Sequence, residues 1–88
     1  MAYTVVISPT AARQLQERLP EAVAWACYEF IRGPLGEEPR RVGAPLRVPF
    51  QGHWRARRGE YRVRYTFNDD SKEIHVLDVD HRRDVYRR

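Results

Sequence analysis

The first part of the chain changes from a strand-like to a helical pattern of apolar residues. Residues 3–7 are aromatic or β-branched, which predicts a strand. Ser8 and Pro9 then form a typical helix start, because serine can cap a helix and proline suits its first position. Apolar residues recur at helical spacing after this start, at Ala12, Leu15 and Leu19. The pattern therefore predicts a strand followed directly by a helix.

A second helix is expected after an interruption at Pro20. It begins at Glu21, and its apolar stripe consists of Val23, Ala26, Cys27, Phe30 and Ile31. Gly33 and Pro34 predict its end, because glycine can adopt the left-handed conformation and proline cannot continue a helix. The two helices should form a helical hairpin. Residues 34–46 are rich in proline and glycine and are expected to form a loop.

The second half of the chain shows the period of two that is typical of strands. Residues 54–57 alternate, and residues 58–60 are a candidate turn. Residues 61–67 alternate clearly between apolar side chains and arginine or threonine. Residues 68–71 have the composition of a hairpin turn, and residues 73–79 predict the last strand.

This order of elements, strand, helix, helix and three strands, predicts an α+β fold. We expect a single domain over residues 1–88, with the N-terminal strand and the helical hairpin packed on a mostly antiparallel sheet of about four strands. The apolar side chains of the middle strand should face the helices, namely those of Tyr61, Val63, Tyr65 and Phe67. In the last strand the alternation places Ile74 and Val76 on one face and His75, Leu77 and Val79 on the other. Apolar residues on both faces predict that this strand is central.

Charge points to a polyanionic partner. The formal net charge is +4, and of the 16 basic residues only Lys72 is a lysine. Arginine is preferred where a planar group binds phosphate through two hydrogen bonds. A basic cluster of this kind suits nucleic acid or an acidic protein, and composition alone does not choose between them.

The strand pattern places part of this charge on one surface. Arg55, Arg57, Arg62 and Arg64 all alternate with apolar residues, so they should project away from the helices. Neighbouring strands lie ~4.8 Å apart and same-face residues ~6.6 Å apart along a strand. The four guanidinium groups should therefore be close enough to contact adjacent phosphates of one nucleic-acid strand.

Several other classes of site have little support in the sequence. A membrane span and a signal peptide are not expected, and the cytoplasm is the default location. The single Cys27 is expected to be a small buried hydrophobe. His53, His75 and His81 lack metal-ligand spacing, so neither a metal nor a cofactor is predicted.

Two strings and a loop resemble the RelE branch of the RelE/ParE toxin superfamily. The strings are GHWRARRGEYRVRY at residues 52–65 and VDHRRDVYR at residues 79–87, and the loop is RVGAPL at residues 41–46. The likeness extends over nearly the whole chain and includes the order of the elements. The resemblance therefore implies a RelE-like fold and a toxin of a type II toxin–antitoxin system.

The resemblance also implies an activity and its partners. RelE-like members enter the ribosomal A site and cleave the bound mRNA without a metal. The ribose 2′-hydroxyl attacks the adjacent phosphate and leaves a 2′,3′-cyclic phosphate. A cognate antitoxin wraps the toxin and neutralises it.

Residue roles follow from matching the two strings to the family. Arg62 would hold the scissile phosphate and stabilise its developing charge, with help from Arg82. Tyr86 and His81 are the candidates for proton transfer, and Tyr86 could also orient a base. The expected RNA-binding residues are Arg55, Arg57, Arg64 and Arg83.

One departure from the family limits the chemistry of the arginine cluster. Arg55 and Arg57 stand where RelE-like enzymes often have lysines, and an arginine effectively cannot lose its proton. Trp54 could stack on a base. Two alternatives stay open at this point: a ParE-like inhibitor of DNA gyrase, and a catalytically silent basic module that an antitoxin neutralises.

Overall fold

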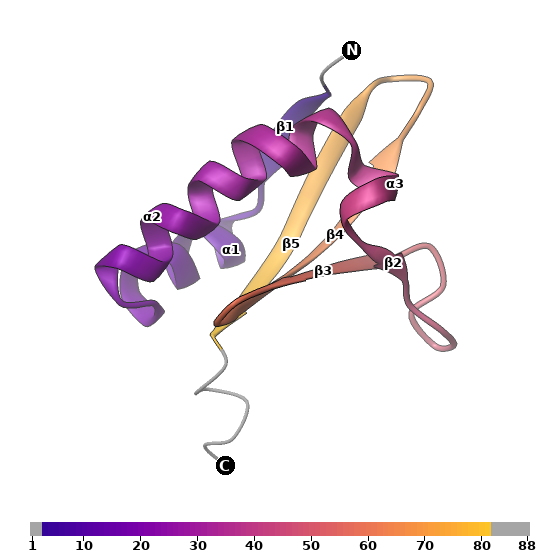
Figure 1. Cartoon of the computed structure of the whole chain (residues 1–88). Helices are drawn as coiled ribbons and strands as arrows, with labels where there is room; N and C mark the ends of the chain where they lie inside the picture. The colour runs from indigo at the N-terminus through magenta and orange to yellow at the C-terminus, as the bar shows by residue number, and fades with distance from the viewer. Residues whose placement is uncertain (1–2, 82–88) are drawn as a thin grey trace.

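A computed structural model describes residues 3–81 of the chain. Helical segments pack against a five-stranded sheet, which confirms the α+β class (Figure 1). The elements are β1 (Thr4–Ile7), α1 (Pro9–Arg13), η1 (Gln14–Arg18), α2 (Glu21–Phe30), η2 (Ile31–Leu35), α3 (Pro39–Val42), β2 (Ala44–Pro45), β3 (Trp54–Arg58), β4 (Tyr61–Asn68) and β5 (Glu73–His81). The predicted strands and both turns of the second half are present.

The sheet is mixed, and its strand order is β1-β5-β4-β3-β2. Strands β3, β4 and β5 form an antiparallel meander, whereas β1 pairs in parallel with β5. The last strand therefore lies between two others, as predicted. The sheet has one strand more than expected, because the two-residue β2 pairs with the start of β3.

The first helix is positioned by its cap. The Ser8 hydroxyl oxygen accepts a hydrogen bond from the Ala11 amide at 3.0 Å, and Pro9 occupies the first turn, as predicted. The Ser8 hydroxyl also donates to the Leu77 carbonyl oxygen at 2.8 Å. The side-chain oxygen of Gln14 accepts from the Val79 amide at 2.6 Å. Helices α1 and η1 thus cover the edge of β5 that extends beyond β1, where unpaired backbone groups would otherwise be exposed.

The second helix begins at Glu21 as predicted but does not end at Gly33 and Pro34. It continues as the π-helical turn η2, which includes Pro34. A proline in a regular α-helix clashes with the carbonyl four residues earlier, and a π turn changes this spacing. Continuation also buries Ile31 and Leu35 completely, which favours the helix over a loop.

The segment expected to be an irregular loop contains α3 and β2 and lies close to the sheet. A Cβ added to Gly43 would lie 2.8 Å from the Arg55 carbonyl oxygen and would also collide with the Tyr65 hydroxyl. That hydroxyl donates to the Pro39 carbonyl oxygen at 2.5 Å. Gly43 therefore lets its backbone lie close to that of Arg55. The sequence did not indicate this role, because Gly43 lies among other turn-forming residues.

The core lies between the sheet and the helices. Tyr61, Val63 and Tyr65 of β4 are buried on this face, as predicted, and Phe67 is half-buried at its end. Cys27 is completely buried, and burial raises the pKa of its thiol to about 12, so it behaves as a small hydrophobe. The same face includes Trp54, whose ring centroid lies 5.2 Å from that of Phe67.

The prediction of which face of the last strand Val79 occupies is wrong. Tyr65 pairs with Val76 but Arg64 pairs with Asp78, so the register shifts and Leu77 is an extra residue. This β-bulge turns Val79 into the core with Ile74 and Val76, whereas uninterrupted alternation placed it on the opposite face. It also brings Asp78 beside Arg64.

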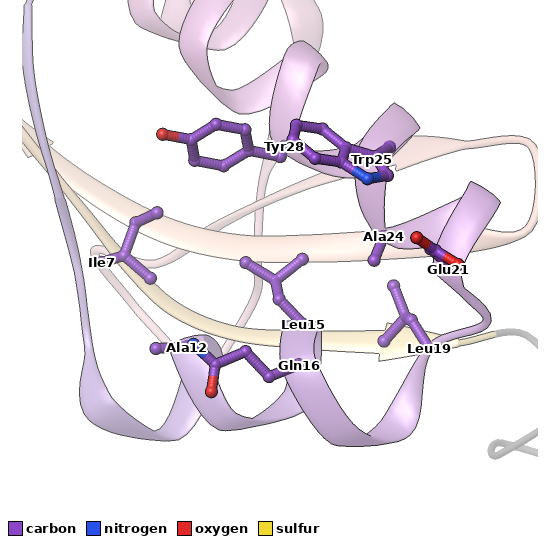
Figure 2. A pocket seen from close by; sticks show the side chains of 9 residues that line it. All are labelled: Ile7, Ala12, Leu15, Gln16, Leu19, Glu21, Ala24, Trp25 and Tyr28. Carbon is purple, nitrogen blue, oxygen red and sulfur yellow. The ribbon is translucent and has the colours of Figure 1, made fainter.

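An open apolar groove with a volume of about 780 Å³ lies between the first helical arm, which consists of α1 and η1, and the second, which is α2. Figure 2 shows Trp25 and Tyr28 of α2 on one side and Leu15 and Leu19 on the other. Its remaining lining residues are Ile7, Ala12, Gln16, Glu21 and Ala24. Within residues 3–81, no helix is both long and apolar enough to cross a membrane.

Candidate nucleic-acid interface

Four arginines form one surface on the side of the sheet opposite the core. We call Arg55, Arg57, Arg62 and Arg64 the arginine face. Strand register places Arg55 directly opposite Arg64 and Arg57 directly opposite Arg62. The intervening residues Ala56 and Val63 are buried, so the alternation of β3 and β4 separates the core from the basic surface as predicted.

Two aspartates of β5 extend the two rows of arginines. Arg64 pairs in register with Asp78, and Arg62 pairs with Asp80. Each row therefore runs across three strands as arginine, arginine and aspartate. The aspartates lower the repulsion among the guanidinium groups, and they give the basic surface an acidic border.

Arg64 is held in place from two sides. Its Nε donates to Oδ2 of Asp78 at 2.9 Å, and its terminal nitrogen forms an ion pair with the same oxygen. Another terminal nitrogen, Nη1, lies 2.9 Å from Nδ1 of His53. The Arg64 and Asp78 side chains are only 30% and 22% exposed, so this ion pair is partly shielded from water. Arg64 is thus a positioned group and differs from its three neighbours.

The other three arginines present their charge outward. Arg55 and Arg57 are exposed, and Arg62 is half-buried. With respect to residues 3–81, none of these three forms an ion pair with a carboxylate. Three guanidinium groups are therefore available within the described chain to bind an anion.

Three of the four residues of the arginine face line a concave site with a volume of about 410 Å³. Thr10 and Gln14 of the first helical arm and Leu46 and Phe50 of the β2–β3 loop also line it. We call this hollow the arginine groove; its other lining residues are Arg55, Arg62, Arg64, Asp78 and Asp80. Because Arg57 does not line the groove, the predicted cluster is divided between the hollow and its rim.

Not every predicted site residue reaches this surface. His81 pairs with Tyr61 on the core face, is only 3% exposed, and its Nε2 lies 3.3 Å from Oε1 of Glu60. It is therefore on the side of the sheet away from Arg62. The remaining predicted residues, Arg82, Arg83 and Tyr86, lie outside the described residues.

Sequence reasoning missed His53, which contacts Arg64, and also Asp78 and Phe50, which line the groove. His53 precedes Arg55 and Arg57 at the spacing of two, so the alternation that identified the arginines could have found it. Asp78 enters through the β-bulge, for which the sequence has no clear signal. Phe50 lies in an irregular loop, where periodicity says nothing about direction.

The described residues of the site favour anion binding over proton transfer. Arginine remains protonated in proteins, so the arginine face can bind phosphate and stabilise negative charge. Burial raises the pKa of Tyr61 and raises that of Tyr65 to about 12, and both side chains lie on the core face. Among residues 3–81, no three His, Cys, Asp or Glu side chains gather in a way that could hold a metal ion.

Comparison with known proteins identifies the family. The family model described as the ParE toxin of the type II toxin–antitoxin system, parDE, matches residues 2–86. Toxin RelG of Mycobacterium tuberculosis is 47% identical over 88 residues and the match covers the whole of both chains. Toxin RelE of the same organism is 47% identical over 85 residues, which are 97% of this chain and 87% of that protein.

Solved structures give the same result. A chain in the crystal structure of the toxin–antitoxin complex RelBE2 from M. tuberculosis matches with a TM-score of 0.90 and 44% identity, covering 93% of this chain and all of that one. A chain of the archaeal RelE–RelB complex from Pyrococcus horikoshii OT3 matches with a TM-score of 0.71 and 32% identity, over 93% of this chain and 97% of that chain. The chain therefore belongs to the RelE/ParE superfamily and is a toxin of a type II toxin–antitoxin system.

Proposed function

We propose that this toxin is an endoribonuclease that cuts mRNA bound in the ribosomal A site. The observation that supports the proposal is the arginine groove, in which guanidinium groups line a hollow of about 410 Å³. Planar guanidinium groups suit phosphate because they offer paired donors in a fixed geometry. A strand of mRNA would supply several phosphates at the spacing of the arginine face.

In the proposed reaction the ribose 2′-oxygen attacks the adjacent phosphorus and the bond to the 5′-oxygen breaks. The 2′-hydroxyl loses a proton and the leaving 5′-oxygen gains one, which yields a 2′,3′-cyclic phosphate and a 5′-hydroxyl. Arg62 would hold the scissile phosphate and stabilise the charge that develops on it, with help from Arg82. Arg55, Arg57 and Arg83 would bind flanking phosphates, and Arg64 would border the same path from its fixed position.

Proton transfer needs a group other than an arginine. The side chain of His81 lies on the core face, so we assign this step to Tyr86 or to the ribosome. This assignment makes catalysis depend on the positioning of mRNA by the ribosome. It also places the activity in the cytoplasm and requires a cognate antitoxin, whose acidic segment could cover the basic surface.

The proposal predicts that Arg62→Ala abolishes ribosome-dependent cleavage while the protein stays folded. Arg62 borders the groove on the face opposite the core, so its loss removes phosphate binding and leaves core packing intact. Toe-printing of mRNA on ribosomes measures cleavage, and circular dichroism measures the fold. Arg18→Ala is a matched control, because this exposed arginine lies at the end of η1. A folded Arg62→Ala protein that cut at the parental rate would refute the assignment.

A second candidate activity is inhibition of DNA gyrase, as in ParE-like toxins. The observation that favours it is the match of residues 2–86 to a model described as a ParE toxin. Such an activity would need no phosphodiester chemistry. A supercoiling assay with purified gyrase distinguishes the two, and detection of a 2′,3′-cyclic end separates cleavage from mere binding by a silent module.

A further inference from the structure

An exposed aromatic side chain lies among the charged groups of the arginine groove. Phe50 belongs to the β2–β3 loop and is 49% exposed. Of the described residues that line the groove, Phe50 alone is aromatic. Phe50 therefore presents an accessible aromatic side chain beside the charged groups of the groove.

The loop holds this ring in place through its own backbone. The Phe50 amide donates to the Arg47 carbonyl oxygen at 2.8 Å, and the His53 amide donates to the Phe50 carbonyl oxygen at 3.0 Å. The Leu46 amide donates to the His53 carbonyl oxygen at 2.8 Å, which closes the base of the loop. Phe50 is therefore presented by a closed turn, and less conformational entropy is lost when it binds a ligand.

Two groups of the site lie beside the Phe50 ring. The Arg64 guanidinium carbon is 5.7 Å from the ring centroid, within the range of a cation–π contact. The His53 ring lies 6.1 Å away at an interplanar angle of 32°. Because Asp78 and His53 also hold Arg64, one chain of contacts links the aromatic ring to the arginine face.

We propose that Phe50 is a stacking platform for one base of a single-stranded RNA whose phosphates bind the arginine face; the inference rests on the proposed function. An aromatic face beside a basic groove is the common design of single-strand binding sites, because every base has a flat face that can stack. Trp54, which the sequence analysis named as a candidate for base stacking, packs against the core on the opposite face of the sheet. Phe50 is therefore a substrate-positioning residue, distinct from the arginines that bind phosphate.

The test measures binding of a short labelled single-stranded RNA made uncleavable by 2′-O-methylation. Phe50→Ala should raise its Kd by about 5- to 150-fold, the range expected for loss of one base–aromatic stack. Phe50→Trp should preserve the affinity. Val48→Ala is the matched control, because Val48 is 73% exposed in the same loop but does not line the groove.

A series of RNAs with one abasic nucleotide at successive positions identifies the stacked base. At one position the missing base should weaken binding to the parental protein as much as Phe50→Ala does. The same abasic RNA should bind the Phe50→Ala protein with no further loss. Additive losses at every position would overturn the inference, since they would show that Phe50 contacts no base.

Arg62→Ala separates failure of this inference from failure of the proposed function. If Arg62→Ala weakens RNA binding and Phe50→Ala does not, the stacking role is wrong and the RNA-binding face stands. If neither variant changes the binding of free RNA, the stacking role is wrong, and toe-printing of Arg62→Ala on ribosomes decides the proposed function separately. A Phe50→Ala protein that bound RNA normally but lost affinity for its antitoxin would overturn the stacking role in favour of a protein contact.

Discussion

Arg64 shows how one side chain in a basic cluster can serve structure rather than binding. Its guanidinium group is committed to Asp78 and His53, although its position in the sequence pattern equals that of its neighbours. Four guanidinium groups at strand spacing repel one another, and Asp78 offsets part of this repulsion. The charge of the arginine face is therefore limited by an acidic residue at its border.

We predict that Asp78→Asn makes RNA binding more sensitive to salt and makes the protein less stable. Release of Arg64 would add at most one phosphate contact. One more contact steepens the slope of log K against log salt by about 0.7 for a single strand. Loss of the charged hydrogen bonds should lower the free energy of unfolding by about 1–2 kcal/mol. Salt titration of RNA binding and urea denaturation measure the two effects.

Asp70→Asn is the matched control for this prediction, because it removes the same charge from the exposed β4–β5 turn. It should leave the free energy of unfolding nearly unchanged. An Asp78→Asn protein with the slope of the control would show that Arg64 does not reach phosphate even when released.

At the scale of elements, one carboxylate joins three separate parts of the chain. Asp69 in the β4–β5 turn accepts a hydrogen bond from the Tyr3 hydroxyl at 2.6 Å and one from Nη1 of Arg40 at 3.1 Å. Tyr3 precedes β1, and Arg40 belongs to α3. The hydrogen bonds from Arg40 and then from Tyr3 lower the pKa of Asp69 from 3.8 to about 2.

This lowered pKa predicts a loss of stability in acid. The folded protein holds Asp69 ionised more firmly than the unfolded chain, so the contribution is complete above about pH 4 and is lost as the pH falls toward 2. Asp69→Asn should remove this part of the pH dependence. Thermal unfolding measured from pH 5 to pH 2 should therefore show a shallower fall in Tm for Asp69→Asn than for the parental protein. Equal slopes would show that the contact does not persist in solution.

The parts of the fold that the sequence predicted are those with a local cause. The Ser8 cap, the break at Pro20 and the alternation of β4 each depend on neighbouring residues, and all three are confirmed. The course of the helix past Pro34 and the β-bulge at Leu77 depend on packing against distant elements. The same distinction applies to the site, because alternation predicted the arginine face whereas the bulge and the loop determine its neighbours.

At the scale of the molecule, the two faces of one sheet divide stability from binding. On β3 and β4 the apolar residues point into the core and the four residues of the arginine face point to the opposite side. Hydrophobic burial on the first face stabilises the fold, and the exposed charge of the second contributes little to it. Substitutions on the two faces should therefore have separable effects.

Two variants, one on each face of the sheet, should therefore differ in which property they lose. Replacing Arg55, Arg57 and Arg62 together by alanine should lower the salt slope of RNA binding by about 2, because three phosphate contacts are lost. The free energy of unfolding should stay the same or rise, since like charges are removed from adjacent strands. Val63→Ala should instead lower it by about 2 kcal/mol and keep the salt slope, because Val63 is completely buried in the core. Urea denaturation and salt titration of both proteins measure the two quantities. A triple variant as unstable as Val63→Ala would mean that the arginines also support the fold.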